Sequence, residues 1–155
     1  MRPAKYVWDT GPFIRLSVLD PDVFVSVYAA VGDMLTDGTI VSCKAVFDEI
    51  DDKSGVLKAW CTRYKSAFTR PGLEEQLLVR DMLDRYQYLL KQQDIVQGKQ
   101  VADPFVIARG KHLGVTVVTT ERFKPNAQKI PNVCKHYDVE SCDLMGFFKL
   151  EGLTF

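Results

Sequence analysis

The sequence lacks clustered cysteine and histidine ligands, long apolar segments and an amino-terminal signal pattern. Its 155 residues include four cysteines, no two of them in a C-x-x-C pair, and two histidines, so a zinc cluster is not expected. We expect the cysteines to be buried, reduced thiols. No apolar run approaches the roughly 18 residues of a membrane helix, and the first residues do not resemble a signal peptide. These absences predict a cytoplasmic protein.

An excess of charge of one sign is also missing, because 20 basic residues balance 20 acidic ones. A protein that is basic over its whole surface is therefore not expected. The stretch from residue 98 to residue 135 differs, since it holds seven basic residues and only two acidic ones, Asp103 and Glu121. As candidates for contacts with the phosphates of an anionic substrate we take five of its cations: Lys99, Arg109, Lys111, Arg122 and Lys124. Ordinary solvated surface charge is the alternative for each of them.

The amino-terminal part of the chain contains a short apolar run that ends in an acidic residue. Residues 6–8 are aromatic or β-branched and favour a strand, whereas Gly11 and Pro12 cannot continue one. Asp9 is therefore expected at the carboxyl end of a strand. In open α/β sheets this is the edge at which ligands bind.

Helical patterns alternate with short strand patterns along the rest of the chain. The apolar spacing and the positions of glycine and proline predict helices at 12–16, 20–37, 44–50, 56–68, 71–93, 102–112 and 144–150. Strands are predicted at 6–8, 39–42, 115–119 and 133–137, with a loop at 130–132. Strands separated by helices pair in parallel through right-handed crossovers. We therefore expect an α/β fold, a three-layer α/β/α sandwich with a central parallel sheet, forming one domain over residues 1–155.

Four carboxylates are expected to meet at one edge of this sheet. Asp9 and Glu121 each follow a strand, and Glu49 lies about one turn into the helix after the second strand. Asp103, at the start of a helix that precedes a strand, is expected to join them. Four carboxylates close together would repel one another without a cation, and Mg²⁺ or Mn²⁺ prefers oxygen ligands of this kind. The sequence predicts a divalent metal site at this edge.

Each carboxylate also has a simpler interpretation. Asp103 followed by Pro104 is typical of a helix N-cap with proline at the next position. Glu49 lies among other acids and is compatible with a solvated surface. The triplet Asp9-Thr10-Gly11 is found in aspartic proteases, but a retroviral-type protease is nearly all β, unlike the helical pattern here. Residues 60–70 interleave aromatic and basic side chains, which is compatible with nucleic-acid binding, although buried rings beside solvated cations are the simpler interpretation.

Several runs resemble the PIN-domain nucleases, and among them the toxin members of the VapC kind and a branch of uncharacterised PIN-like proteins. The runs are YVWDTGPFI at 6–14, DEI at 48–50, ADPFVIA at 102–108 and GVTVVTTE at 114–121, followed by IPNVC at 130–134 and DL at 143–144. They span nearly the whole chain in order. Two departures are Gly11-Pro12, where the family often has a third polar residue, and Glu121, where it usually has aspartate.

The resemblance implies a metal-dependent endoribonuclease that cleaves RNA phosphodiester bonds. Asp9, Glu49, Asp103 and Glu121 would be its catalytic residues and ligands of Mg²⁺ or Mn²⁺. Thr10 and Thr119 fall where the family places supporting hydroxyls. The implied partners are an RNA substrate and a cognate antitoxin protein, with homodimer formation and the number of metal ions left open.

Two other classes of function are compatible with the same sequence. A PIN-like fold without activity would act as an interaction module. A response-regulator receiver domain also gathers acids at a sheet edge, but it requires an adjacent pair of acids after the first strand. Trp8 and Thr10 flank Asp9 instead, which argues against the receiver domain.

Overall fold

A central sheet of five parallel strands organises the molecule. The computed structural model describes residues 1–51, 55–86 and 101–154. The strands are β1 (Tyr6–Trp8), β2 (Ile40–Cys43), β3 (Phe68–Thr69), β4 (Thr116–Val118) and β5 (Ser141–Cys142). They lie in the order β3-β2-β1-β4-β5, with every neighbouring pair parallel.

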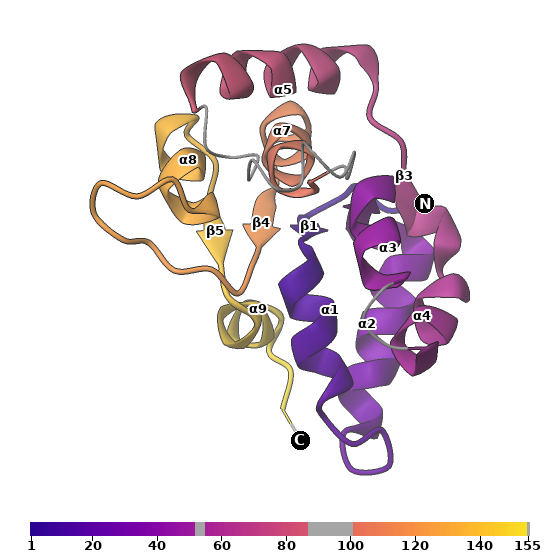
Figure 1. The fold of residues 1–155 in the computed structure, drawn as a ribbon. Coiled ribbons are helices and arrows are strands. Elements are labelled where there is room, and N and C mark those ends of the chain that lie inside the picture. The colour runs from indigo at the N-terminus through magenta and orange to yellow at the C-terminus, as the bar shows by residue number, and fades with distance from the viewer. Residues whose placement is uncertain (52–54, 87–100, 155) are drawn as a thin grey trace.

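Helices cover both faces of this sheet. They are α1 (Thr10–Ser17), α2 (Val25–Asp37), α3 (Lys44–Asp51), α4 (Gly55–Thr62), the 3₁₀ helix η1 (Lys65–Ala67), α5 (Leu73–Arg85), α7 (Asp103–Leu113), α8 (Ile130–His136) and α9 (Leu144–Glu151). Figure 1 shows α7 and α8 above the strands, α1, α2 and α9 below them, and α5 stacked on α7. The predicted α/β sandwich with a parallel sheet is therefore confirmed.

Aromatic side chains fix the end of β1. Trp8 is fully buried, and its ring lies 5.0 Å from that of Phe13 on α1 and 5.2 Å from that of Phe147 on α9. The carbonyl of Trp8 accepts a hydrogen bond of 2.7 Å from the Ser42 hydroxyl. Rings of this size bury a large apolar area and restrain their own backbone. Asp9, the next residue, thus starts from a rigid position.

The segment before the last strand differs from the prediction. We expected a loop at 130–132 and an edge strand at 133–137, which is wrong, because Ile130–His136 forms α8. Pro131 lies in its first turn, where a missing N–H is tolerated. Ile130, Val133 and Cys134 bury one face of the helix with a spacing of three to four residues. The edge strand is β5 instead.

Other helix and strand boundaries also differ from the prediction. The predicted helix 56–68 ends at Thr62 and is followed by η1 and by β3, a strand that we did not predict. The helix expected from residue 20 begins at Val25. The predicted helix 71–93 corresponds to α5, which ends at Arg85, and its expected continuation beyond residue 86 lies outside the described residues.

The cysteines are free thiols. Cys43, Cys61 and Cys134 are buried, as expected, whereas Cys142 is partly exposed. Among the helices in the described ranges, none combines the length and the apolar character that crossing a membrane requires.

Candidate active site

The strand order reverses direction between β1 and β4. The chain passes from β1 to β2 and β3 on one side, and β4 and β5 lie on the other side. Trp8 of β1 pairs with Val118 of β4, so the residues that follow these two strands emerge next to each other. A crevice outside the carboxyl ends of parallel strands, at such a switch point, is the usual ligand site of open α/β sheets. Asp9 and Thr119 are the first residues beyond these two strands.

Asp9 is a buried carboxylate that does not take its usual local role. It occupies the N-cap of α1 with an extended backbone (φ −76°, ψ 174°), yet its side chain makes no capping hydrogen bond. The residue is only 6% exposed. Its Oδ2 accepts a hydrogen bond of 3.1 Å from the Thr119 hydroxyl, whereas its buried Oδ1 has no hydrogen-bond partner among the described residues. One oxygen of Asp9 is thus desolvated and accepts no hydrogen bond of normal geometry, although the backbone amide of Thr10 is near enough to lower the pKa of Asp9.

The electrostatics of Asp9 connect it with two of the other predicted acids. Burial raises the pKa of Asp9 to about 7. The backbone amide of Thr10 and the hydroxyl of Thr119 oppose this rise in the pKa, and the charges of Glu49 and Glu121 add to it. Glu49 and Glu121 therefore each lie within electrostatic reach of Asp9. Strongly shifted carboxyl groups in such a position are typical of functional sites.

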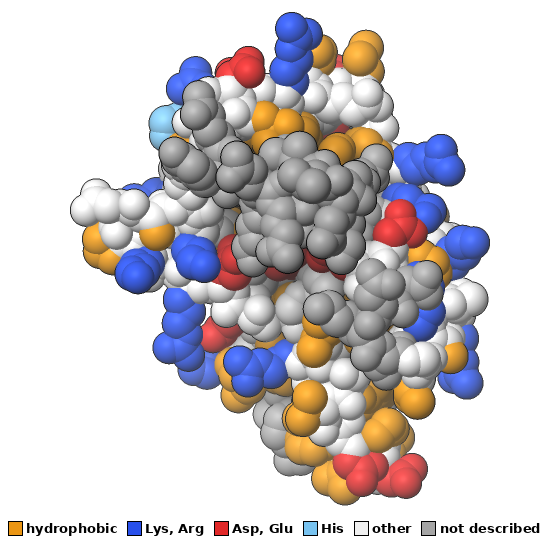
Figure 2. Space-filling view, in the orientation of Figure 1, with side chains coloured by type: hydrophobic (Ala, Val, Ile, Leu, Met, Phe, Trp, Pro, Cys, Tyr) orange, Lys and Arg blue, Asp and Glu red, His pale blue; other side chains and the backbone are white. Residues whose placement is uncertain are grey.

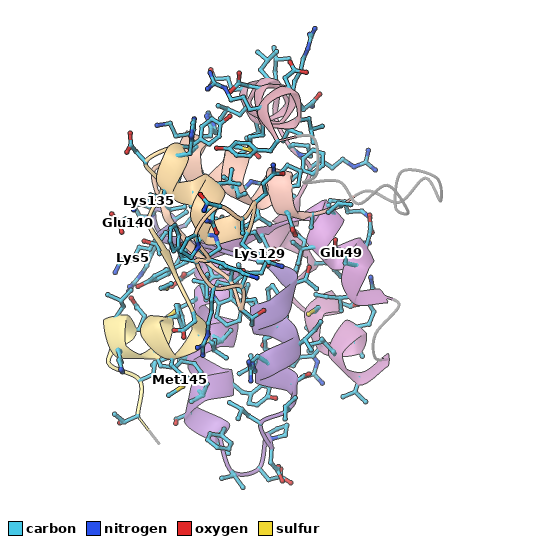
Figure 3. The ribbon with its side chains drawn as sticks, turned by 60° about the vertical axis from the view of Figure 1, so that its left-hand side comes forward. Lys5, Glu49, Lys129, Lys135, Glu140 and Met145 are labelled. Atoms are coloured by element: carbon cyan, nitrogen blue, oxygen red, sulfur yellow. The ribbon has the colours of Figure 1, made fainter. Side chains whose placement is uncertain are left out.

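Glu49 links the starts of two helices. It extends from α3, as Figure 3 shows. Its Oε2 accepts a hydrogen bond of 2.6 Å from the hydroxyl of Thr10, the first residue of α1. Its Oε1 accepts one of 3.0 Å from the backbone amide of Ala102, just before α7. The alternative of a plain solvated acid is therefore wrong for Glu49.

Asp103 reaches the same edge through this link. It is the first residue of α7, directly after the amide that Glu49 binds, and it is partly exposed. The cap position of α7 is Ala102, so the interpretation of Asp103 as the N-cap is wrong. The contact at Ala102 thus brings the start of α7 to Glu49, although this helix precedes a strand.

Glu121 is held on the other side of the switch point. Its Oε2 accepts a hydrogen bond of 2.8 Å from the backbone amide of Ile130, at the start of α8. Its own amide donates to the Thr119 hydroxyl at 3.2 Å, and that hydroxyl donates to Asp9. Thr119 therefore connects Asp9 with Glu121, as Thr10 contacts Glu49. The role of the two hydroxyls as supporting groups stays a prediction.

Gly11 allows the two strand ends to approach closely. A Cβ placed on Gly11 would lie 2.1 Å from the Thr120 hydroxyl oxygen and 3.0 Å from its Cβ. No larger residue fits without displacing Thr120, the neighbour of Thr119. Glycine at this position thus has a steric reason.

The carboxylates do not form a ready-made metal cage. Within residues 1–51, 55–86 and 101–154, no group of three or more His, Cys, Asp or Glu side chains is arranged to hold a metal ion. The hydrogen bonds above explain this arrangement, because Glu49 and Glu121 each use an oxygen to accept from a backbone amide. Without a cation, amide and hydroxyl donors and partial protonation of Asp9 limit the repulsion among the acids.

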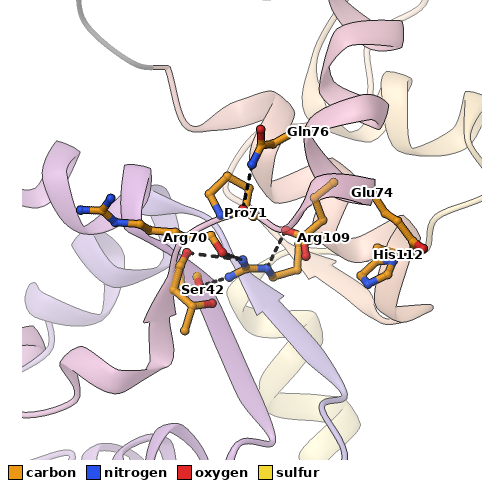
Figure 4. Close-up of polar contacts among 9 residues, drawn as sticks. Ser42, Arg70, Pro71, Glu74, Gln76, Arg109 and His112 are labelled. Carbon is orange, nitrogen blue, oxygen red and sulfur yellow. Dashed lines mark hydrogen bonds and ion pairs between the residues drawn. The ribbon is translucent and has the colours of Figure 1, made fainter.

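The predicted phosphate contacts require corrections. Arg109 is only 4% exposed and forms a buried ion pair of 3.0 Å with Glu75, so its assignment as a phosphate contact is wrong. Its guanidinium also donates to the carbonyls of Ser42, Thr69 and Arg70, shown for Ser42 and Arg70 in Figure 4. It therefore ties α7 to α5 and to the ends of β2 and β3.

The other four cations fall into three groups. Lys111 lies in the last turn of α7, close to the start of β4, so it is at the opposite edge of the sheet and cannot contact a substrate at the carboxyl edge. Arg122 and Lys124 are exposed directly after Glu121, and their role as phosphate contacts stays a prediction. Lys99 lies outside the described residues.

The fold and the site together define an α/β protein with a carboxylate cluster at its switch point. A family model described as a domain of unknown function (DUF4411) matches residues 6–155. The chain therefore belongs to the DUF4411 family. Neither a curated protein nor a solved structure matches it. The resemblance to PIN-domain nucleases stays a prediction.

Proposed function

We propose that this protein is a metal-dependent endoribonuclease that hydrolyses RNA phosphodiester bonds in the cytoplasm. The observation that supports this proposal best is the burial of the Asp9 carboxylate. A buried carboxylate at a switch point, with one oxygen unpaired and two further acids within electrostatic reach, is costly unless a cation binds there.

The donor set fits a hard divalent cation. Asp9, Glu49, Asp103 and Glu121 offer only carboxylate oxygens, which suit Mg²⁺ and Mn²⁺. A soft ligand is near, since the charges of Asp9 and Glu121 act on Cys134. Burial, and then these two charges, raise the pKa of the Cys134 thiol to about 12, so it stays protonated and does not compete as a thiolate.

Each residue of the site has a role that follows from its contacts. Asp9 presents Oδ1, while the Thr119 hydroxyl holds Oδ2 and so fixes the plane of the carboxylate. Thr10 orients Glu49 in the same way. A bound cation supplies a water of lowered pKa and stabilises charge on the phosphoryl oxygens. Arg122 and Lys124 would attract the phosphate chain to this edge.

The biological setting follows from the resemblance. Toxins of the VapC kind are neutralised by a cognate antitoxin, and we propose that an antitoxin protein covers this site. We also keep an inactive interaction module as the second candidate. The observation in its favour is that Glu49 and Glu121 accept hydrogen bonds from backbone amides in place of a shared cation.

Cleavage of labelled single-stranded RNA tests the proposal. The parent protein should cut it with Mn²⁺ and not with EDTA, and Asp9→Asn should lose several orders of magnitude in rate, because it removes a ligand charge with little change of shape. Asp33→Asn, at an exposed position of α2, is the matched control and should cut like the parent. An interaction module would show no cleavage and no rise of its melting temperature with Mn²⁺.

A further inference from the structure

A second feature of the carboxyl edge lies beside the carboxylates, on the β2 and β3 side. A pocket of about 480 Å³ opens between the end of β2, the start of α3, the connection from β3 to α5, and α7. Its lining includes Cys43, Lys44, Arg70, Pro71, Gln76 and Phe105. None of these residues belongs to the predicted site.

Arg70 supplies an available positive charge at this pocket. Its side chain is exposed and, in the part of the chain that the structure describes, has no ion-pair partner. Its backbone is rigid, because the buried guanidinium of Arg109 donates to the Arg70 carbonyl at 3.1 Å and to the Thr69 carbonyl at 3.4 Å. Figure 4 shows the Arg70 side chain leaving this network and extending away from Arg109. Arg109 thus positions Arg70 instead of binding a phosphate itself.

Lys44 adds a second cation at the start of α3. It is partly exposed and pairs with Asp48 one turn later, which also lines the pocket. An exposed i,i+4 pair contributes little, and a phosphate can replace the carboxylate partner. The amino end of α3 also favours an anion. Figure 2 shows Lys and Arg side chains over the α3 and α4 region as well as on the opposite side, with acidic side chains between them.

Phe105 and Gln76 give the pocket features that a simple phosphate site does not need. Phe105 is a partly exposed aromatic ring on α7, two residues after Asp103. The Gln76 amide nitrogen donates to the Pro71 carbonyl at 3.1 Å, which fixes the side chain and leaves its oxygen to accept a hydrogen bond. A ring beside a polar amide is suited to a nucleobase, through stacking and edge contacts.

The pocket adjoins the carboxylate site. Asp48 precedes Glu49 on α3, and Phe105 follows Asp103 on α7, so two of its walls carry catalytic candidates. Cys43 in the pocket wall lies within electrostatic reach of Asp9. Burial is the largest cause that raises the pKa of the Cys43 thiol. The charge of Arg109 lowers this pKa, and the charges of Glu75 and Asp9 raise it further. A strand bound across Asp9 and Glu49 would continue toward this pocket.

We infer that this pocket binds one nucleotide of a single-stranded RNA, next to the nucleotide that is cut. Arg70 and Lys44 contact its phosphate, and Phe105 stacks on its base. This inference rests on the proposed function. It adds a subsite on the side of the edge opposite to Arg122 and Lys124, so that the RNA crosses the carboxylates between two basic flanks.

Binding of a fluorescent eight-nucleotide RNA to the Asp9→Asn protein tests the inference without cleavage. In that background, Arg70→Gln should weaken binding about tenfold and reduce the salt slope by roughly 0.7, the value for one phosphate contact on a single strand. Phe105→Leu should weaken binding about 5- to 30-fold, and Phe105→Trp should restore it, because stacking is a property of the ring. Lys5→Gln, an exposed cation at the opposite edge of the sheet, is the control and should bind like the background protein.

The outcomes separate the two proposals. If the background protein binds RNA and both pocket variants bind equally well, the subsite is wrong and the ribonuclease proposal stands. If only Arg70→Gln weakens binding, or if poly-glutamate competes as well as unlabelled RNA, the surface is a general anion or acidic-peptide site and the nucleotide assignment is overturned. No RNA binding by the background protein overturns both. Matched melting temperatures of the variants show that they are folded.

Discussion

Replacing Asp9 by asparagine should stabilise the metal-free protein at neutral and alkaline pH. Below its ordinary pKa of 3.8, Asp9 is protonated in both the folded and the unfolded chain. Between this value and about 7, native Asp9 keeps its proton while the unfolded residue has lost it. The native state then binds more protons, so the free energy of unfolding falls as the pH rises through this window.

The magnitude follows from the same shift. A pKa raised from 3.8 to about 7 corresponds to roughly 4 kcal/mol of lost stability above pH 7. Asparagine carries no charge to desolvate, and its side-chain oxygen can still accept from the Thr119 hydroxyl. Its amide group would take the buried position of Oδ1 without a partner, which costs about 1–3 kcal/mol. We therefore expect a net gain of about 1–3 kcal/mol at pH 8.

Urea unfolding in EDTA at several pH values measures this effect. The difference between Asp9→Asn and the parent should be smallest or reversed near pH 4 and should rise until about pH 7. Titrating groups distant from Asp9 cancel to first order, because both proteins contain them in the same surroundings. Adding Mn²⁺ should reverse the order, since only the parent retains the ligand. A variant that is less stable than the parent at pH 8, with a difference independent of pH, would refute a desolvated Asp9.

Three further predictions address the residues around this site. Arg109→Met should lower the free energy of unfolding by about 3–5 kcal/mol, because it leaves the charged partner Glu75 buried. Lys111→Met, on the exposed part of the same helix, is the control and should change this free energy by less than about 0.5 kcal/mol. Urea unfolding measures both. Gly11→Ala should cost about 1–3 kcal/mol through its clash with Thr120, and less in a Thr120→Ala background. Asp103→Asn should melt no lower than the parent in EDTA but respond much less to Mn²⁺ in a thermal-shift assay, while an unchanged response would remove Asp103 from the metal site.

Parts of the site followed from the sequence because they depend on strong local signals. The apolar run before Asp9 and its break at Gly11 place a carboxylate at a strand end whatever the tertiary contacts are. The strand Thr116–Val118 does the same for Thr119 and Glu121. Since parallel strands share a carboxyl edge, these local predictions were sufficient to bring the residues together.

Other features depended on contacts that have no short-range pattern. β3 and β5 are two residues long, too short for a period of two to appear. Arg109 looked like a surface cation, yet residues 106–110 of α7 are all buried. A helix that is apolar all round is a buried helix, and an arginine in its middle then requires an acid. That signal was present in the sequence, but the partner Glu75 was not identifiable without the fold.

The free-energy cost of burying the Asp9 carboxylate also helps to distinguish the two candidate functions. At this position asparagine or serine would be a good N-cap for α1 and could bond to Thr119 without a buried charge. An interaction module gains nothing from the aspartate, because its carboxylate is only 6% exposed and hardly accessible to a protein partner. A cation bound at Oδ1 would offset the desolvation penalty of the buried carboxylate. The proposed metal site would account for the cost that the fold bears at Asp9, and the pH dependence of Asp9→Asn measures that cost directly.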